Sequence, residues 1–322
     1  QTRMLKFVRP QRQWGWEIAI YLYLAGMGAG SFIIGTMVIW FGNHLLAQKT
    51  WEVWNYTINL SKAAILWGPL FVAVGAPFLV LDLGKKLKFY TACLNPRTSW
   101  LARGFFILSA FIVVGLIVFA VSALFIGQRT RFWFGLEIIG VILAFATAIY
   151  TGILLKSIKY VPIWNTPLLP LLFLASALST GSMSIILSLL GFELIPVNHG
   201  LLNTLTSTEQ ILVLIEAFVL AFYLYFRYQQ KDQGETSVRL LLSGQLKLLF
   251  WVGIVLIGLI FPILLEFLYT HSGQPGILVA TGLFLLCGGF FLRLGVLASG
   301  IREQLPMHKL IEIKVNMSAA KK

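Results

Sequence analysis

The sequence predicts an all-α integral membrane protein of about eight transmembrane helices, arranged as two four-helix bundles. The chain is 58% hydrophobic and only 11% charged, and its mean hydropathy is +0.85, both outside the usual range for soluble proteins. Inside a bilayer every backbone N–H and C=O must be satisfied within its own segment. Long apolar runs of about 20 residues are therefore expected to form helices.

Eight such runs follow one another along the chain. They cover residues 16–41, 59–81, 101–126, 133–156, 166–191, 208–227, 246–269 and 276–299. Gly, Pro and Asn residues separate them, and no connection is long enough to form a domain. The first run is too long for a cleavable signal and lacks a cleavage site, so we expect it to span the membrane.

An internal repeat underlies the prediction of two bundles. Residues 22–31 in the first run align with residues 173–182 in the fifth, and small residues recur at matching places. An even number of spans separates them, which suggests two halves of the same orientation, residues 1–160 and 161–322. The alternative is that both stretches are small-residue faces for helix packing.

The positive charge has two interpretations. The net charge is +13, but the basic residues lie between spans, and no soluble domain could present a nucleic-acid-binding face. Most of them lie on the side of the two termini, which the positive-inside rule assigns to the cytoplasm. A basic surface that docks an acidic partner would give the same distribution on either side.

Ionisable residues at membrane depth are costly, so they are candidates for function. Glu17 opens the first run, Asp82 closes the second and Tyr150 lies about two turns from the end of the fourth. Because successive helices reverse direction, all three fall in the leaflet on the side of the termini. They are candidates for one buried polar site, with interfacial snorkelling as the alternative for charges at helix ends.

Four further charged residues lie elsewhere in the predicted spans. Glu137 and Lys62 begin their helices in the opposite leaflet, where they could pair with one another. Glu216 lies near the middle of the sixth run and Arg293 in the last. We expect Glu137, Glu216 and Arg293 to belong either to a proton path or to structural ion pairs.

The residues also exclude several chemistries. All four histidines lie in predicted loops or in the tail, so no pair can ligate a b-type haem across the bilayer. Two separate cysteines cannot build an iron–sulfur or zinc site. Without a P-loop, an H-E-x-x-H sequence or a nucleophile elbow, an ATP-driven pump and an intramembrane hydrolase are disfavoured. We therefore expect no haem or metal in this chain.

Four segments in order resemble the NrfD family, which includes the membrane subunit of polysulfide reductase. They are residues 14–26, residues 79–84 leading to Asn95-Pro96, residues 150–155 running into 165–174, and residues 276–278 with Leu292-Arg293. The similarity extends from about residue 14 to 300. One departure concerns the head of the first helix, where a family member has a histidine and this chain has Glu17.

The resemblance implies a quinone-reactive membrane subunit of a multisubunit respiratory oxidoreductase in the inner membrane of a prokaryote. Such subunits exchange electrons between menaquinone or ubiquinone and a ferredoxin-like iron–sulfur subunit, which connects to a catalytic subunit, often a molybdopterin enzyme. The family usually docks this partner on the outer face, where the first helix begins. The positive-inside rule assigns that face to the cytoplasm, so the two criteria disagree.

The expected mechanism is proton-coupled two-electron transfer in the first bundle. Tyr150 would hold a quinone carbonyl while Glu17 or Asp82 passes the proton to solvent. Trp14, Trp16 and Tyr21 would accept the ring and tail, or serve as an interfacial aromatic belt. A secondary transporter, which would favour helices broken at corresponding places in both halves, and a purely structural anchor are the rival functions.

Overall fold

The computed structural model describes residues 14–46, 50–53, 56–59, 62–81, 99–124, 131–194 and 200–302. Within these ranges eight helices are long and apolar enough to cross a membrane, which confirms the predicted spans. They are α1 (Trp16–Gly42), α2 (Ala63–Leu81), α4 (Trp100–Leu124), α5 (Arg131–Lys156), α6 (Leu168–Gly191), α7 (Gly200–Gln229), a π-helix (Leu249–Ile260) that continues into α9 (Phe261–Ser272), and α10 (Pro275–Ala298).

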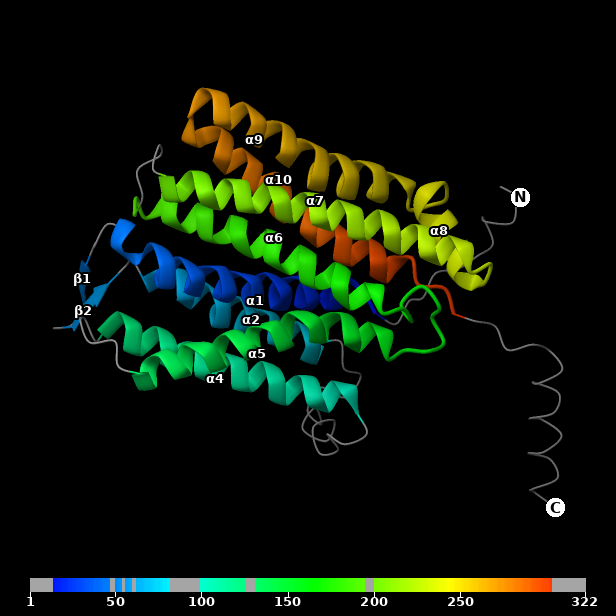
Figure 1. Ribbon diagram of the computed structural model, residues 1–322. Coiled ribbons are helices and arrows are strands. Elements are labelled where there is room, and N and C mark those ends of the chain that lie inside the picture. The colour runs from blue at the N-terminus through cyan, green and yellow to red at the C-terminus, as the bar shows by residue number, and fades with distance from the viewer. Residues whose placement is uncertain are drawn as a thin grey trace, which may run out of the picture.

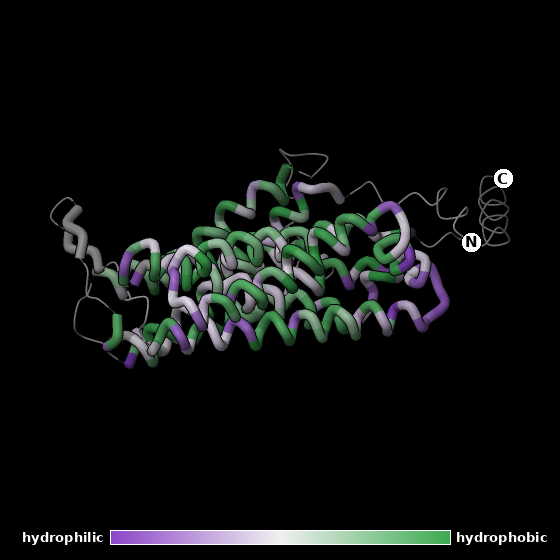
Figure 2. Tube along the Cα trace, turned by 90° about the horizontal axis from the view of Figure 1, so that it is seen from above, coloured by the Kyte–Doolittle hydropathy of each residue, from purple (hydrophilic) through white to green (hydrophobic). Residues whose placement is uncertain are grey.

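The helices run back and forth between two faces of the molecule (Figure 1). We call the face where α1 begins and α10 ends the proximal face, and the face where α1 ends and α10 begins the distal face. Figure 2 shows hydrophobic residues along most of the helix length and hydrophilic residues gathered toward the two ends. This is the distribution that a bilayer selects, because polar groups are costly within its hydrocarbon core.

Helix α1 is the central element. It packs against α2, α5, α6 and α10, with α2, α4 and α5 on one side of it and α6, α7, α9 and α10 on the other (Figure 1). Where α1 crosses α6, a Cβ on Gly30 would overlap the backbone of Ala177, and one on Gly181 would overlap the backbone of Gly30 and Ser31. The two small-residue stretches of the sequence therefore pack on each other, and the division into two four-helix halves stays a prediction.

Helix α7 begins earlier than the hydropathy of the sequence predicted. It starts at Gly200 rather than at residue 208, although threonines lie at three positions around the predicted start. The hydroxyls of Thr204, Thr206 and Thr208 each donate to the carbonyl four residues earlier, at distances of 2.8–3.1 Å. Because these polar groups are satisfied within the helix, it can continue into a region that composition alone marks as a loop.

A short amphipathic helix, α8 (Gln233–Leu242), lies on the proximal face where the sequence predicted a loop. Asp232 caps it by accepting a hydrogen bond from the Gly234 N–H at 2.6 Å. The same carboxylate forms an ion pair with Arg227, at 2.8 Å, which ties the start of α8 to the end of α7. A polar loop thus becomes a helix because one aspartate serves as cap and counter-ion at once.

Two further features went unpredicted. On the distal face, a 3-10 turn (Asn43–Leu45) follows α1, and β1 (Thr50–Val53) pairs antiparallel with β2 (Tyr56–Asn59). The π-helix is the second, and it packs on α10 where Gly258 and Gly288 meet backbone to backbone. It ends at Ile260, and the N–H of the next residue, Phe261, bonds the Leu256 carbonyl, just before Pro262. Proline lacks an N–H, so it cannot extend the hydrogen-bonding pattern.

Candidate functional site

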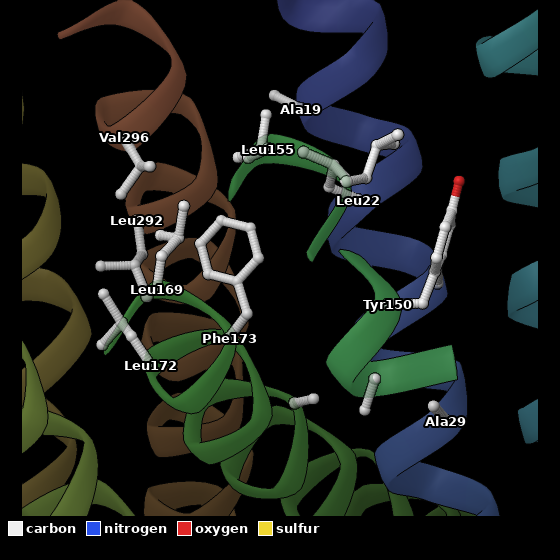
Figure 3. Packing of buried hydrophobic residues seen from close by; sticks show 14 of the residues in the cluster. Ala19, Leu22, Ala29, Tyr150, Leu155, Leu169, Leu172, Phe173, Leu292 and Val296 are labelled. Carbon is white, nitrogen blue, oxygen red and sulfur yellow. The ribbon is translucent and has the colours of Figure 1, made fainter. Parts of the chain in front are cut away.

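Two tyrosines from different helices share a buried site in the α1, α2, α4 and α5 part of the molecule. Tyr21 of α1 and Tyr150 of α5 are both buried, and their phenol groups interact with one another. Neither hydroxyl has a hydrogen-bond partner of regular geometry among the described residues. Figure 3 shows the Tyr150 hydroxyl directed away from the apolar cluster around Phe173. Buried hydroxyls without partners are rare and indicate a place where a ligand or water completes the bonding.

A glycine on α4 makes room for Tyr150. A Cβ built on Gly104 would overlap the end of the Tyr150 phenol ring, including its hydroxyl oxygen. On the neighbouring helix, a Cβ on Gly75 of α2 would come within 3.1 Å of Leu24 of α1. These small residues let α2 and α4 approach close to the tyrosine pair, so the backbone itself forms part of the wall of the site.

The carboxylate predicted for this site lies at its proximal end. Glu17 precedes Tyr21 by four residues on α1, and side chains at this spacing lie on one helical face, one turn apart. Its carboxylate folds back toward Gly15, where a Cβ would lie 2.6 Å from an oxygen. Asp82, the second predicted carboxylate, lies outside the described residues. The structure thus brings Tyr21 and Tyr150 together and places Glu17 one turn away from them along α1.

The two predicted tryptophans lie in different surroundings. Trp14 packs against Trp164 of the α5–α6 connection, with ring centroids 5.8 Å apart, and the Trp164 indole donates to the Val296 carbonyl at 2.8 Å. Trp16 is 57% exposed. Trp14 therefore helps to join the start of α1 to α10, and Trp16 faces outward at the proximal face, as an interfacial aromatic residue does.

A second polar cluster, on the other side of α1, gathers around Arg293 of α10. This fully buried side chain donates to the Ser176 hydroxyl and to the Phe173 carbonyl of α6. Its guanidinium also lies over the Phe173 ring, 4.7 Å from the centroid. Glu216 of α7 lies next to both Ser176 and Arg293. Of the two predicted alternatives for Glu216 and Arg293, a proton path and a structural ion pair, the structure is compatible with both, because the two side chains face the same serine.

Two buried glutamates in this part of the molecule were not predicted as site residues. Glu209 of α7 and Glu266 of α9 are completely buried and lie next to each other. A signal was present in the sequence, because Glu209 and Glu216 are seven residues apart and so share a helical face. It was missed because the predicted run begins at residue 208 and places Glu209 at a helix end, whereas α7 begins at Gly200 and places Glu209 nine residues inside the helix.

Glu137, the third residue predicted for a proton path, lies near the distal end of α5. Its carboxylate accepts a hydrogen bond from the Trp40 indole of α1 at 2.6 Å, and Trp40 in turn packs against Phe134. This contact ties α1 to α5 at the face opposite to Glu17. A part in proton movement stays a prediction for this residue.

A groove of about 490 Å³ lies between α7, α8 and the π-helix. Its walls are aliphatic and aromatic, and include Leu224, Tyr228 and Trp251. Among the described residues no carboxyl or basic side chain lines it, and its two tyrosines, Tyr225 and Tyr228, are exposed rather than buried. We therefore place the candidate redox site at the tyrosine pair rather than in this groove.

Comparison with known proteins relates nearly the whole chain to one family. The family described as "Polysulphide reductase, NrfD" matches residues 5–303. A protein of Wolinella succinogenes that is named as one of the chains of polysulfide reductase is 31% identical over 313 residues, which cover 89% of this chain and 94% of that protein. Protein NrfD of Escherichia coli is 28% identical over 309 residues, with 89% and 94% covered.

A more distant relative has a different named activity. A protein of Mesobacillus selenatarsenatis that is named as one of the subunits of selenate reductase is 24% identical over 299 residues, which cover 78% of this chain and 66% of that protein. The similarity therefore extends to subunits of reductases that are named for different substrates.

Proposed function

The chain belongs to the polysulphide reductase NrfD family, and we propose that it exchanges electrons with a membrane quinone at the Tyr21–Tyr150 site. Family and helices together make it a multi-pass protein of the bacterial inner membrane. It is a membrane subunit of a reductase complex, and two of its relatives are each named as one component of a reductase, which implies a catalytic subunit beside it. The finer proposals concern the quinone and the electron partner.

The observation that carries the quinone proposal is a pair of buried phenol groups that interact with each other but have no hydrogen-bond partner of regular geometry among the described residues. A quinone oxygen accepts a hydrogen bond, and the corresponding quinol oxygen both donates and accepts one. In our proposal Tyr150 holds this oxygen and Tyr21 lies beside it. The two hydroxyls would then gain the partner that the described residues do not supply.

Proton transfer belongs to the same proposal. Oxidation of one quinol releases two electrons and two protons, and a base must accept the protons as charge develops. Glu17 is suited to pass a proton to the proximal face, because it lies one turn from Tyr21 and is only half-buried. Asp82 remains the alternative carboxylate, and Glu216 and Arg293 are the candidates for proton movement through the rest of the molecule.

The electron partner in this proposal is a ferredoxin-like iron–sulfur subunit that connects to a catalytic subunit of the molybdopterin type. Menaquinone or ubiquinone is the membrane substrate. The iron–sulfur subunit would dock on the proximal face, because Tyr21 and Tyr150 lie five and six residues, or about 8–9 Å of helix, from the proximal ends of their helices. Docking there keeps the electron path short.

A secondary transporter fits the helices less well. Helix α2 continues through both Pro69 and Pro77, and the π-helix gives way to α9 at Pro262. In the proposed pairing of halves, α2 corresponds to α7 and the π-helix and α9 to α4, so these irregularities do not fall at corresponding places. Transporters built from repeats place broken helices at corresponding positions in the two halves.

The test is quinol-dependent reduction by the copurified complex. We expect Tyr150→Phe to lower turnover about 10²-fold, the low end of what a positioned proton-transfer group contributes. Glu17→Gln should lower it about tenfold or more for the same reason. Tyr225→Phe, at a 61% exposed tyrosine on α7, is the matched control, and assembly is checked in every variant. Unchanged turnover in both site variants would favour a purely structural anchor.

A further inference from the structure

The quinone site leaves one buried acidic pair without a role, Glu209 and Glu266. Both side chains have no exposed surface, and the two carboxyl groups interact with each other. None of their four oxygens has a hydrogen-bond partner of regular geometry among the described residues. Two ionised carboxylates in contact repel one another, whereas one proton held between them removes a charge and supplies the missing donor.

Among the residues that the structure describes, the charges around the pair do not compensate it. Glu216 adds a third buried carboxyl, and Arg293 is the buried cation that interacts with it. Three carboxylates and one guanidinium would carry a net charge of −2 if all were ionised. The other groups that face the pair, Ser179 and Gln210, are neutral. Bound protons, rather than basic side chains, are therefore expected to neutralise most of the carboxyl groups in this cluster.

The pair and the quinone site lie in opposite halves of the membrane. Glu209 lies nine residues from the start of α7, and Glu266 six residues from the end of α9. At 1.5 Å per residue they are about 13 and 9 Å from the distal ends of their helices. Tyr150 lies six residues, or about 9 Å, from the proximal end of α5.

Polar side chains connect the two halves. Ser179 lies beside both Glu209 and Glu216, and Glu216 is about 10 Å deeper than Glu209 along α7. Arg293 reaches α1, where a Cβ on Gly26 would lie 3.1 Å from its guanidinium. Tyr23 of α1 interacts with this arginine. A line of polar groups thus leads from the distal half to the helix that carries Tyr21.

We propose that Glu209 and Glu266 form a proton-binding pair that exchanges protons with the distal face during quinone turnover. The inference rests on the proposed function, which supplies the protons. When one quinol is oxidised to quinone, two electrons pass to the partner subunit and one proton leaves through Glu17 to the proximal face. The other proton passes to Glu216 and on to the pair, which releases one proton to the distal face. Quinone reduction reverses each step.

The first test detects protonated carboxyl groups by chemical labelling and does not depend on quinol turnover. Dicyclohexylcarbodiimide adds to protonated carboxyl groups in apolar surroundings and leaves a stable N-acylurea, which peptide mass spectrometry locates. In the intact complex we expect labelling at Glu209 or Glu266 at least about tenfold above that at Glu137, because a shared proton is held only at the pair. Glu137 is the matched control, a buried carboxylate with an indole donor. Equal labelling at the three positions overturns the proposal.

The second test counts protons in vesicles that contain the complex. We expect Glu209→Gln and Glu266→Gln each to oxidise quinol while the protons released at the distal face fall by about one per quinol, because the pair holds one exchangeable proton. Glu235→Gln on α8 is the control and should leave the count unchanged. An unchanged count in both pair variants, with quinol still oxidised, overturns the proposal.

The two tests separate this inference from the proposed function. An assembled wild-type complex that fails to oxidise quinol overturns the quinone site and the coupling of the pair to it. The labelling then still decides whether the pair holds a proton. If a Gln variant fails to assemble, the other variant and the labelling of the wild-type complex carry the test.

Discussion

Replacing Gly104 by alanine tests whether the position of Tyr150 controls the proposed quinone reaction. The added methyl group would occupy space that the end of the Tyr150 phenol ring now fills. Carbon and oxygen atoms in contact lie about 3.5–4 Å apart, so the phenol must move by more than about 1 Å. The substitution therefore retains the Tyr150 phenol group and changes only where it lies.

The expected effect on turnover is at least comparable to the effect on stability. A displacement of about 1 Å at a reacting group can cost about 10²-fold in rate, which corresponds to about 2.7 kcal/mol of activation free energy. The overpacking itself should cost about 1–3 kcal/mol of folding free energy. We therefore expect Gly104→Ala to give an assembled complex whose quinol-dependent turnover resembles that of Tyr150→Phe.

The assay is quinol-dependent reduction by the copurified complex, with subunit content measured in the same preparation. Gly135→Ala on α5 is the matched control, because a Cβ there meets nothing within 4 Å. Alanine in place of a helical glycine should stabilise the protein by about 0.5–1 kcal/mol. Wild-type turnover by an assembled Gly104→Ala complex would refute the reasoning that places the quinone oxygen at the Tyr150 hydroxyl.

Three other substitutions separate packing from chemistry. Gly30→Ala should lower the melting temperature of the complex strongly, since its Cβ overlaps helix backbone, which cannot rotate away, whereas Gly191→Ala, with open space around it, should not. Asp232→Asn keeps the N-cap but removes the charge that pairs with Arg227. It should lower the free energy of unfolding, measured by thermal unfolding, by about 1.5–3 kcal/mol. An unchanged melting temperature would contradict that role. Trp16→Leu should leave quinol turnover within about twofold, because surface substitutions usually change free energies by less than about 0.5 kcal/mol. A larger loss would indicate that the quinone site includes Trp16 at the proximal surface.

The spans were predictable because a bilayer leaves the backbone no alternative to the helix. The same rule places Tyr150 and Glu17 on the proximal side, since helix direction alternates. The contacts between side chains of different helices were harder to predict from the sequence. Tyr21 was predicted only as an apolar surface for the quinone, and its contact with Tyr150 depends on how α1 and α5 rotate about their axes. Hydropathy does not report that rotation when a helix is apolar on every face.

The unpredicted features depend on tertiary contacts. The π-helix packs on α10 where Gly258 and Gly288 approach closely, and these two residues are far apart in sequence. Helix α8 depends on Asp232, whose role as a cap is readable only once the preceding helix is known to end at Gln229. Glu266 becomes a candidate functional residue only once the structure places it next to Glu209 of α7. Each feature involves residues that the sequence does not relate until helices are packed together.

In the proposed mechanism, helix α1 connects the two clusters. Tyr21 and Tyr23 are two residues apart, so they point to different sides of the helix; the first meets Tyr150 and the second interacts with Arg293. Charge that develops at the tyrosine pair during quinol oxidation is therefore separated from the buried arginine by a single helix. In such apolar surroundings charges interact over longer distances than in water. In the proposed mechanism, a proton that leaves the quinone site would change the field at Glu216, and electron transfer on one side of α1 would thereby favour proton transfer on the other.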